Sequence, residues 1–400
     1  MLCILALVSI AVVWAEGLIK SRSAAIVCFI LAAAAFAVRA ICMTHETLDY
    51  QDFLTVWVDF FRSHGGLSGL GLSVGNYNVP YLFFLALFSY SGIRDLFLIK
   101  LLSVAFDIVL AWAAMRLAGA LTKSRTSRLI AFWGTLLLPT VVLNGAYWGQ
   151  CDSIYASLAV LSVYLALDKK PWLSVVSIAF SFAFKLQAIF IMPLFFVFLY
   201  TGRMKIYHLL AFPAAYTAAV MPAVLAGRPL ADTLMIYLDQ AGSVGGGLNY
   251  NSSSVFAFAT SETNSALWSK LGVAVAFAFC VMVFVWFYLN RRRVTDRALL
   301  GAALLFAVGL PFLLPHMHDR YFFIADGLSF VLAVVAPVYL PVPVGVSFAS
   351  LLGYHAYLKL RYFLPMSYGA CALIIVLLLT VLFSAFSMTF SATNGELFNE

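Results

Sequence analysis

Two carboxylates stand out among the side chains of this sequence that could do chemistry. Asp49 and Asp52 lie in the segment TLDYQDF, with Tyr50 between them, directly after an early run of apolar residues. A carboxylate at the edge of an apolar region can act as the general base for a hydroxyl nucleophile. An aspartate before an amphipathic helix is also a common N-cap, and position alone favours the cap. Both interpretations stay open at this point.

Amides and aromatic rings, which together suit the binding of a sugar, occur in two further segments. The first, GNYNVPYLFFL, contains Asn76, Tyr77 and Asn78, although a plain turn into a re-entrant helix explains it equally well. The second, NGAYWGQCDSIY, separates two apolar runs. Its candidate residues are Tyr147, Trp148, Gln150 and Asp152. The aromatic rings also fit an interfacial belt, and the aspartate also fits a helix cap.

Cations that could meet a phosphate occur in two segments. Lys185 in AFKLQAIF is either a snorkelling lysine or a phosphate partner. The segment PHMHDRYFF contains His316, His318, Asp319 and Arg320. An arginine fork matches phosphate oxygens, while the alternative is a solvated loop. Two histidines and one aspartate are few ligands for a metal, so we expect no metal site and no cofactor.

One glycine-rich segment could move or contact a ligand. GGGLNYNSSS, residues 245–254, contains three consecutive glycines followed by Asn249. Three glycines permit tight backbone conformations, so the segment is typical of a flexible lid or of a loop that touches its ligand.

The elements that must position these residues are membrane helices. The 400 residues are 64% hydrophobic and only 10% charged, against about 25% charged in ordinary soluble domains. Apolar runs of eighteen residues or more recur, long enough to cross a hydrocarbon core of about 30 Å. Two of them, 266–289 and 366–389, have no polar face. We therefore expect an all-α polytopic membrane protein, a bundle of about 11–13 transmembrane helices forming a single domain over 1–400.

Basic residues in the short connections indicate how the chain is threaded. The formal charge of +7 comes largely from these connections, which is typical of positive-inside topology and gives no reason to expect a nucleic acid. The basic loops predicted to be cytoplasmic contain Lys20 and Arg22; Lys123, Arg125 and Arg128; Lys169 and Lys170; Arg203 and Lys205; and Arg291, Arg292, Arg293 and Arg297. The spans threaded between them are 2–18, 24–43, 95–119, 129–147, 151–167, 172–184, 186–200, 206–226, 266–289, 298–314, 320–338, 341–357 and 366–389. Lys359 and Arg361 then fall outside, against the rule.

Two long connections, 44–94 and 227–265, face the non-cytoplasmic side in this threading. Each contains a segment that reads as an amphipathic helix suited to a membrane interface, 51–62 and 229–240. The apolar side of the first is predicted to consist of Phe53, Leu54, Trp57, Phe60 and Phe61. Because both loops face the same side, they could close over one cavity. Asp107, inside a span, is expected to pair with a polar group on a neighbouring helix.

The order of these motifs resembles the GT-C superfamily of multi-spanning glycosyltransferases, which use polyprenyl-phosphate sugars. The resemblance rests on the Asp-Tyr pair after an early span, the Asn-Tyr-x-x-Pro-Tyr-like segment, the YWGQ-D turn, the FK-Q segment and the late HMHDRYFF motif. It covers about residues 24–338, and within the superfamily the chain is similar to the dolichol-pathway glucosyltransferases and their bacterial relatives.

The resemblance implies the roles of several residues. The general base falls on Asp49, with Asp52 as runner-up, and the late histidine motif falls near the donor phosphate. From the resemblance we expect a polyprenyl-phosphate donor that carries a hexose, and inverting transfer to a hydroxyl of a glycan, glycolipid or protein acceptor. We expect the site on the non-cytoplasmic face of a bacterial cytoplasmic membrane. A phosphate is a good leaving group, so one carboxylate and a set of cations suffice. The rival interpretations are a transporter or flippase of a lipid-linked sugar, and a scaffold subunit without activity.

Overall fold

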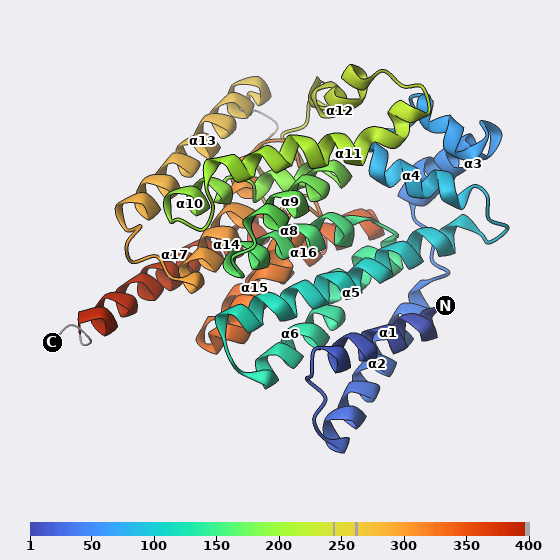
Figure 1. Cartoon of the computed structure of the whole chain (residues 1–400). Helices are drawn as coiled ribbons and strands as arrows, with labels where there is room; N and C mark the ends of the chain where they lie inside the picture. The colour runs from blue at the N-terminus through green and yellow to red at the C-terminus, as the bar shows by residue number, and fades with distance from the viewer. Residues whose placement is uncertain (243–244, 261–262, 397–400) are drawn as a thin grey trace.

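A computed structural model describes residues 1–242, 245–260 and 263–396 of the chain (Figure 1). Seven of its helices are long and apolar enough to cross a membrane by themselves. They are α2 (Arg22–Cys42), α5 (Asp95–Leu121), α11 (Ala211–Leu225, extended by the short η5, Ile206–Leu210), α13 (Ser265–Leu289), α14 (Asp296–Leu313), α16 (Pro341–Lys359, preceded by η7, Pro337–Tyr339) and α17 (Met366–Glu396). The expectation of an all-α polytopic membrane protein is confirmed.

The remaining predicted spans are also helical, but they are shorter or broken. One is the pair α6 (Arg125–Leu137) and α7–η3 (Pro139–Val142 and Leu143–Trp148), bent by 43°. The others are α1 (Leu2–Ala15), α8 (Asp152–Leu167), α9 (Pro171–Phe184), η4–α10 (Leu186–Phe190 and Leu194–Tyr200) and α15 (Phe323–Val335). By length and composition, seven or eight helices of the described chain can span alone, fewer than the predicted count. The predicted ranges joined caps and turns to helices that end earlier.

The bend before α7 has a local cause. Leu138 has extended backbone angles because Pro139 follows it, and a residue before proline avoids the helical region. The chain then forms the wide turn η3 and ends it at Gly149, whose φ is +83°. This broken helix brings the YWGQ segment into the interior of the bundle.

The core lies around α14, which is buried along nearly its whole length between α8, α13, α15 and α17 (Figure 1). Small residues let helices approach closely there. At Gly301, for example, a Cβ atom would come within 2.1 Å of the Ser384 hydroxyl on α17. A rigid interior of this kind fixes the ends of the helices that carry the polar residues.

The two long connections contain helices, as predicted. Loop 1 (residues 44–94) contains η1 (Tyr50–Leu54), α3 (Thr55–Ser63), η2 (Gly66–Gly71) and α4 (Val79–Phe88). Loop 2 (residues 227–265) contains α12 (Leu230–Gly242), β1 (Asn249–Tyr250) and η6 (Val255–Phe258). Residues 243–244 and 261–262 of loop 2 lie outside the described part.

The predicted apolar face of the first amphipathic helix is correct only in part. Leu54, Trp57 and Phe61 are buried, but Phe53 is 48% exposed and Val58 is fully buried. The helix starts with the wide turn η1, which places more residues in one turn than an α-helix does and so shifts the phase of the side chains.

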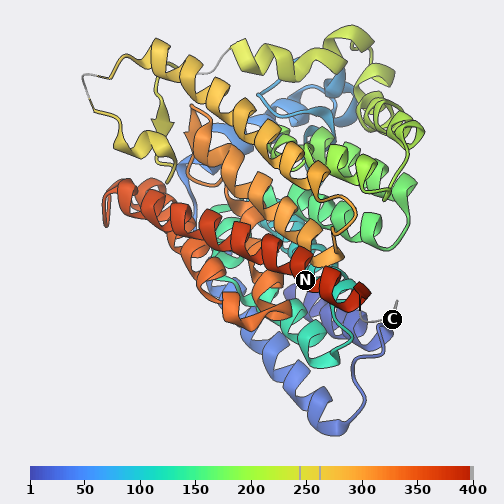
Figure 2. The same ribbon diagram turned by 90° about the vertical axis from the view of Figure 1, so that its left-hand side faces the viewer.

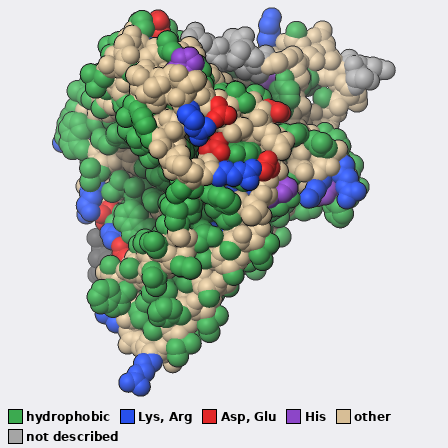
Figure 3. Space-filling model, turned by 90° about the vertical axis from the view of Figure 1, so that its right-hand side faces the viewer, with side chains coloured by type: hydrophobic (Ala, Val, Ile, Leu, Met, Phe, Trp, Pro, Cys, Tyr) green, Lys and Arg blue, Asp and Glu red, His purple; other side chains and the backbone are tan. Residues whose placement is uncertain are grey.

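Both long loops lie at the same end of the bundle (Figures 1 and 2). Loop 1 follows the end of α2 and precedes α5, and loop 2 precedes α13, whereas basic residues occur at the other ends of these helices: Arg22, Lys123 and Arg291. Loop 2 also pairs with the late histidine motif, since β1 runs parallel to β2 (Met317–His318). Figure 3 shows acidic and basic side chains gathered among hydrophobic ones on one face, and a separate basic group at the lower tip.

Candidate active site

Asp49 is held by three hydrogen-bond donors. Its Oδ2 accepts from Trp148 Nε1 at 2.8 Å and from Gln150 Nε2, and its Oδ1 accepts from the Tyr357 hydroxyl at 2.6 Å. These donors come from the η3 turn and from the end of α16. A carboxylate has about four acceptor positions, so Oδ1 retains one for a further hydroxyl.

A second carboxylate, Asp152, lies among cations. It forms an ion pair with Lys185, and its Oδ2 lies 3.9 Å from Arg320 Nε. Asn144 donates to the same Oδ2 at 2.7 Å. Arg320 also contacts Asp319, with 3.4 Å between Nη1 and Oδ1. Each cation of this group is therefore already balanced, at least in part, by a carboxylate.

Contacts connect the two carboxylates into one polar cluster. The Tyr77 hydroxyl donates to Gln150 Oε1 at 3.3 Å, and Lys185 Nζ lies 5.5 Å from the Tyr77 ring. The Arg320 guanidinium lies 5.4 Å from the ring of Trp148, which donates to Asp49. We use the term polar cluster for Asp49, Tyr77, Trp148, Gln150, Asp152, Lys185, Asp319 and Arg320.

Several buried polar atoms of this region have no hydrogen-bond partner within the described residues. They are Arg320 Nε, Asn144 Oδ1 and the hydroxyl of Tyr155, a residue whose ring lies 5.8 Å from Lys185 Nζ. Buried polar atoms in folded proteins are nearly always hydrogen-bonded. Unpaired donors and acceptors next to a lysine and an arginine therefore suit a polar ligand.

The segment between α14 and α15 has unusual protonation. Burial raises the pKa of Asp319 from 3.8 to about 7, although Arg320 acts in the opposite direction. Burial, together with Arg320 and Lys185, lowers the pKa of His318 to about 4. At neutral pH His318 is thus an uncharged imidazole, stacked on Tyr250 of loop 2 with 4.8 Å between ring centroids.

Loop 1 is fastened where it carries Asp49. Lys100 of α5 is fully buried, and its Nζ donates to the Cys42 and His45 carbonyls at 2.9 and 2.5 Å. The Thr47 hydroxyl donates to the Trp148 carbonyl at 3.0 Å. Ser103, also on α5, donates to the Gln150 carbonyl at 2.6 Å. Side-chain hydrogen bonds to backbone carbonyls therefore hold both segments, the start of loop 1 that carries Asp49 and the YWGQ turn that bonds Asp49.

Other residues predicted for the site lie outside the polar cluster. Asp52 and Asn76 are exposed. The Tyr50 hydroxyl donates to Asp95 at 2.8 Å. Asn78 is the N-cap of α4 and donates to the Tyr216 hydroxyl at 3.1 Å. The Asn249 side chain closes a turn through two hydrogen bonds with the backbone N–H and carbonyl of Ser252.

His316 also lies apart from the cluster. Its two ring nitrogens lie 2.6 Å from the Gly247 carbonyl and 3.1 Å from the Ser269 hydroxyl. Its backbone φ is +63°, an uncommon conformation that the bond from its N–H to the Leu248 carbonyl supports. His316 thus connects loop 2, α13 and the late motif. Tyr147 stacks on His45 beside the cluster, with 3.8 Å between ring centroids.

Sequence reasoning missed three residues of this region. Tyr357, which binds Asp49, lies in the run YHAYLKLRY, where repeated tyrosines at the end of a span were a usable signal. Asn144 belongs to the recognised polar turn but was not singled out. Lys100 lies within an apolar span, which is itself a signal because a charge there is costly. Asp107 pairs with a neighbouring helix as expected, with Arg39 of α2 at 2.7 Å.

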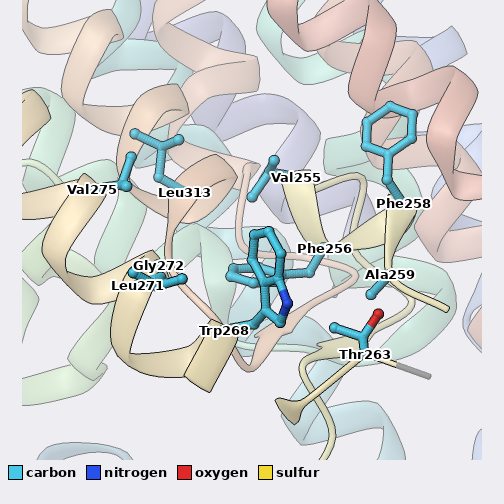
Figure 4. A pocket seen from close by; sticks show the side chains of 10 residues that line it. All are labelled: Val255, Phe256, Phe258, Ala259, Thr263, Trp268, Leu271, Gly272, Val275 and Leu313. Atoms are coloured by element: carbon cyan, nitrogen blue, oxygen red, sulfur yellow. The ribbon is translucent and has the colours of Figure 1, made fainter. Parts of the chain in front are cut away.

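An apolar cavity of about 340 Å³ lies near His316, between η6 and the first turns of α13 (Figure 4). Phe256, Trp268, Leu271 and Leu313 are among its lining residues, and Thr263 is the polar one. Trp268 and Val275 are about half exposed, 49% and 50%, so the cavity borders the surface of the bundle. Within the described residues, no group of three histidine, cysteine or acidic side chains could hold a metal ion.

Residues 85–201 match the model of a family described as alpha-(1->6)-mannopyranosyltransferase, N-terminal domain. The match includes the YWGQ-D turn and Lys185, and it ends before the late histidine motif. No curated protein matches the chain at a significant level. The family match confirms the resemblance to the GT-C superfamily and supports a membrane glycosyltransferase. The family model describes a mannosyltransferase, whereas the sequence motifs are similar to those of the dolichol-pathway glucosyltransferases.

Proposed function

We propose that this protein transfers a mannosyl residue from a polyprenyl-phosphate donor to a hydroxyl of a glycan acceptor. The observation that carries the proposal is the carboxylate of Asp49, held by three donors and joined by contacts to Lys185 and Arg320. The family match is the reason for proposing mannose as the transferred sugar. A free carboxylate position next to cations suits a reaction in which a hydroxyl attacks and a phosphate leaves.

In the proposed reaction, Asp49 Oδ1 accepts the proton of the acceptor hydroxyl. The hydroxyl oxygen attacks the anomeric carbon from the face opposite the phosphate, and the bond between that carbon and the phosphate oxygen breaks. Polyprenyl phosphate leaves with the bonding electrons, so the configuration inverts. No general acid is needed because the leaving phosphate is stable as an anion.

Lys185 and Arg320 are the proposed partners of the donor phosphate. Their carboxylate partners keep them in place before the donor arrives. Arg320 Nε, which has no hydrogen-bond partner within the described residues, offers the phosphate a charge-assisted hydrogen bond. Neutral His318 adds a ring nitrogen, while we assign His316 to holding loop 2. Tyr77, Trp148 and Gln150 are the proposed contacts of the transferred sugar.

The apolar cavity beside η6 and α13 suits part of the isoprenoid chain of such a donor. Its lining is almost entirely hydrophobic, and it opens toward the surface that faces lipid if α13 spans the bilayer (Figure 4). We place the reaction on the non-cytoplasmic face, since the polar cluster lies at the end opposite the basic loops.

The test is a transfer assay with purified protein, polyprenyl-phosphate mannose and an alkyl α-mannoside acceptor. We expect polyprenyl phosphate and mannosylated product in equal amounts. Asp49→Asn should lower the turnover rate by about 10²- to 10⁴-fold, the usual range for a general base, and leave donor binding intact. Asp52→Asn, an exposed neighbour, is the matched control and should stay near wild type. Donor binding without turnover would favour a transporter instead.

A further inference from the structure

A lysine near the proposed catalytic base has no acidic partner within the described residues. Lys359 follows Tyr357 by two residues at the end of α16 and is exposed. Its Nζ lies 3.3 Å from the Tyr147 hydroxyl and 5.7 Å from the Tyr147 ring centroid. Within the part of the chain that the structure describes, no carboxylate forms an ion pair with it. Lys185 and Arg320 differ from Lys359 because each of them forms an ion pair with a carboxylate.

Two aromatic rings stack face to face next to this cation. His45 and Tyr147 stack at 3.8 Å with an angle of 18° between their planes. Burial, Lys100 and Lys359 together lower the pKa of His45, so the imidazole is uncharged at neutral pH despite the opposing effect of Glu46. Glu46 itself pairs with Arg94. We call His45, Tyr147 and Lys359 the platform.

The platform adjoins the residues that bond the proposed base. Tyr147 immediately precedes Trp148, and both Trp148 and Tyr357 donate to Asp49. Trp148 and Tyr357 also stack on each other, with 4.6 Å between ring centroids. A molecule resting on the platform would therefore lie next to the two residues that hold Asp49. That position suits the acceptor of the proposed reaction.

The position of Lys359 is unusual for a membrane protein. Basic residues are enriched in cytoplasmic loops, yet Lys359 lies at the end of the bundle opposite the basic loops. Since its charge opposes the topology signal and pairs with no carboxylate of the described chain, it is free to meet an anion of a bound molecule.

We propose that the platform binds the acceptor and that Lys359 recognises an anionic group on it, of the phosphate ester class. This inference rests on the proposed function, because it takes Asp49 as the base that the acceptor must reach. The outer side of the stacked His45 and Tyr147 rings would hold a sugar, and Lys359 would hold a phosphate attached to the same glycan.

The direct test is binding, which does not require turnover. Two probes are compared: octyl α-mannoside, and the same mannoside with a phosphate ester on one of its sugar hydroxyls. We expect wild-type protein to bind the phosphorylated probe about five- to tenfold more tightly, as for one partly exposed ion pair worth roughly 1 kcal/mol. Salt at about 1 M should reduce that preference, because it shortens the screening length to about 3 Å.

Three variants separate recognition from structure. Lys359→Met should abolish the preference for the phosphorylated probe and leave binding of octyl α-mannoside unchanged, while Lys359→Arg should retain the preference. Arg361→Met is the matched control, an exposed cation two residues further on that should keep the wild-type preference. Equal binding of both probes by wild type, or an equal loss of both in Lys359→Met, overturns the inference.

The same measurement distinguishes this inference from the proposed function. A preference for the phosphorylated probe in a protein that transfers no mannose would support the anion site and contradict the transferase. Transfer to octyl α-mannoside with no preference would support the transferase and contradict the anion site. Inorganic phosphate should compete with the phosphorylated probe for wild-type protein, because Lys359 would bind either phosphate. Competition that survives in Lys359→Met would place the phosphate site elsewhere and overturn the inference.

Discussion

Asp319 is the individual residue whose chemistry differs most from expectation. Sequence reasoning grouped it with the histidines of HMHDRYFF as part of a phosphate motif, yet a carboxylate does not attract an anion. Its burial and its contact with Arg320 give it a different part: it balances the arginine when the site is empty. Because its pKa is about 7, it could take up a proton if, as proposed, the donor phosphate replaces it as the partner of Arg320.

Donor binding should therefore depend on pH through Asp319. The carboxyl group is neutral below about pH 7 and charged above it, so a phosphodiester donor competes with a full charge only at higher pH. We expect donor affinity to fall by up to about tenfold per pH unit above 7, in the limit where binding requires the neutral form. The measurement is the donor dissociation constant from pH 6 to 8.5.

Asp319→Asn supplies the comparison, because an amide does not titrate. Its donor affinity should be flat over the same range and close to the value of wild type at pH 6. A diester donor is needed, since a monoester titrates itself. An unchanged slope in the variant would assign the pH dependence to another group.

At the scale of single elements, helix α5 holds the site through hydrogen bonds to backbone carbonyls. α5 contributes Lys100 and Ser103, which bond carbonyls of loop 1 and of the YWGQ turn and so hold the two segments in register. A displacement of about 1 Å in a reacting group can cost about 10²-fold in rate. Lys100 thus positions Asp49 without touching substrate.

Lys100→Met should lower the turnover rate by about 10- to 100-fold while donor affinity stays near wild type, because the donor partners lie on other segments. The test is the separate measurement of turnover and donor binding in the transfer assay. Lys270→Met, at an exposed lysine of α13, is the matched control. A parallel loss of donor binding in Lys100→Met would indicate general unfolding rather than misplacement of the base.

α2 is joined to α5 by a buried ion pair. Arg39 and Asp107 are both fully buried, and two guanidinium nitrogens donate to Asp107 Oδ2 at 2.7 and 3.0 Å. Removing one partner leaves an uncompensated buried charge, which typically costs about 3–5 kcal/mol, whereas replacing both by apolar residues is often nearly neutral.

Arg39→Met alone should therefore lower the free energy of unfolding by about 3–5 kcal/mol, and adding Asp107→Leu should restore most of that loss. Thermal unfolding in detergent measures both variants. If the double variant were as unstable as the single one, the contribution of the pair would lie in its hydrogen bonds, including the one that Ser153 donates to Asp107.

At the scale of the whole molecule, the bundle has a basic end and an end with the long loops. The polar cluster, the platform and the apolar cavity all belong to loops or helix ends at the second. A lipid-linked donor diffusing in one leaflet would meet all three. We expect that end to face away from the cytoplasm.

Cysteine labelling tests this orientation. Ser73→Cys in loop 1 should react with a membrane-impermeant thiol reagent added to intact cells, and Thr126→Cys at the start of α6 should react only after lysis; both positions are exposed. The wild-type protein, with its six cysteines, sets the background. Reaction of Thr126→Cys in intact cells would reverse the assignment.

The sequence by itself determined the class of this protein and the approximate positions of its helices. Hydropathy is a property of each segment alone, so every predicted span proved helical and both long loops were found, with the segments from which the polar cluster is built. Several of the predicted spans, such as α15, are shorter than the sequence suggested, because hydropathy does not mark where a helix begins or ends.

Only the tertiary structure decided which side chains meet. Asp49, Trp148 and Tyr357 come from three distant segments, and they are brought together by the packing of η3 and α16 against loop 1. The same packing leaves Asp52 exposed and turns His316 toward loop 2. The direction of a side chain depends on helix phase, which a wide turn such as η1 shifts, and on which helices are neighbours. Both are set by non-local contacts that no local pattern contains.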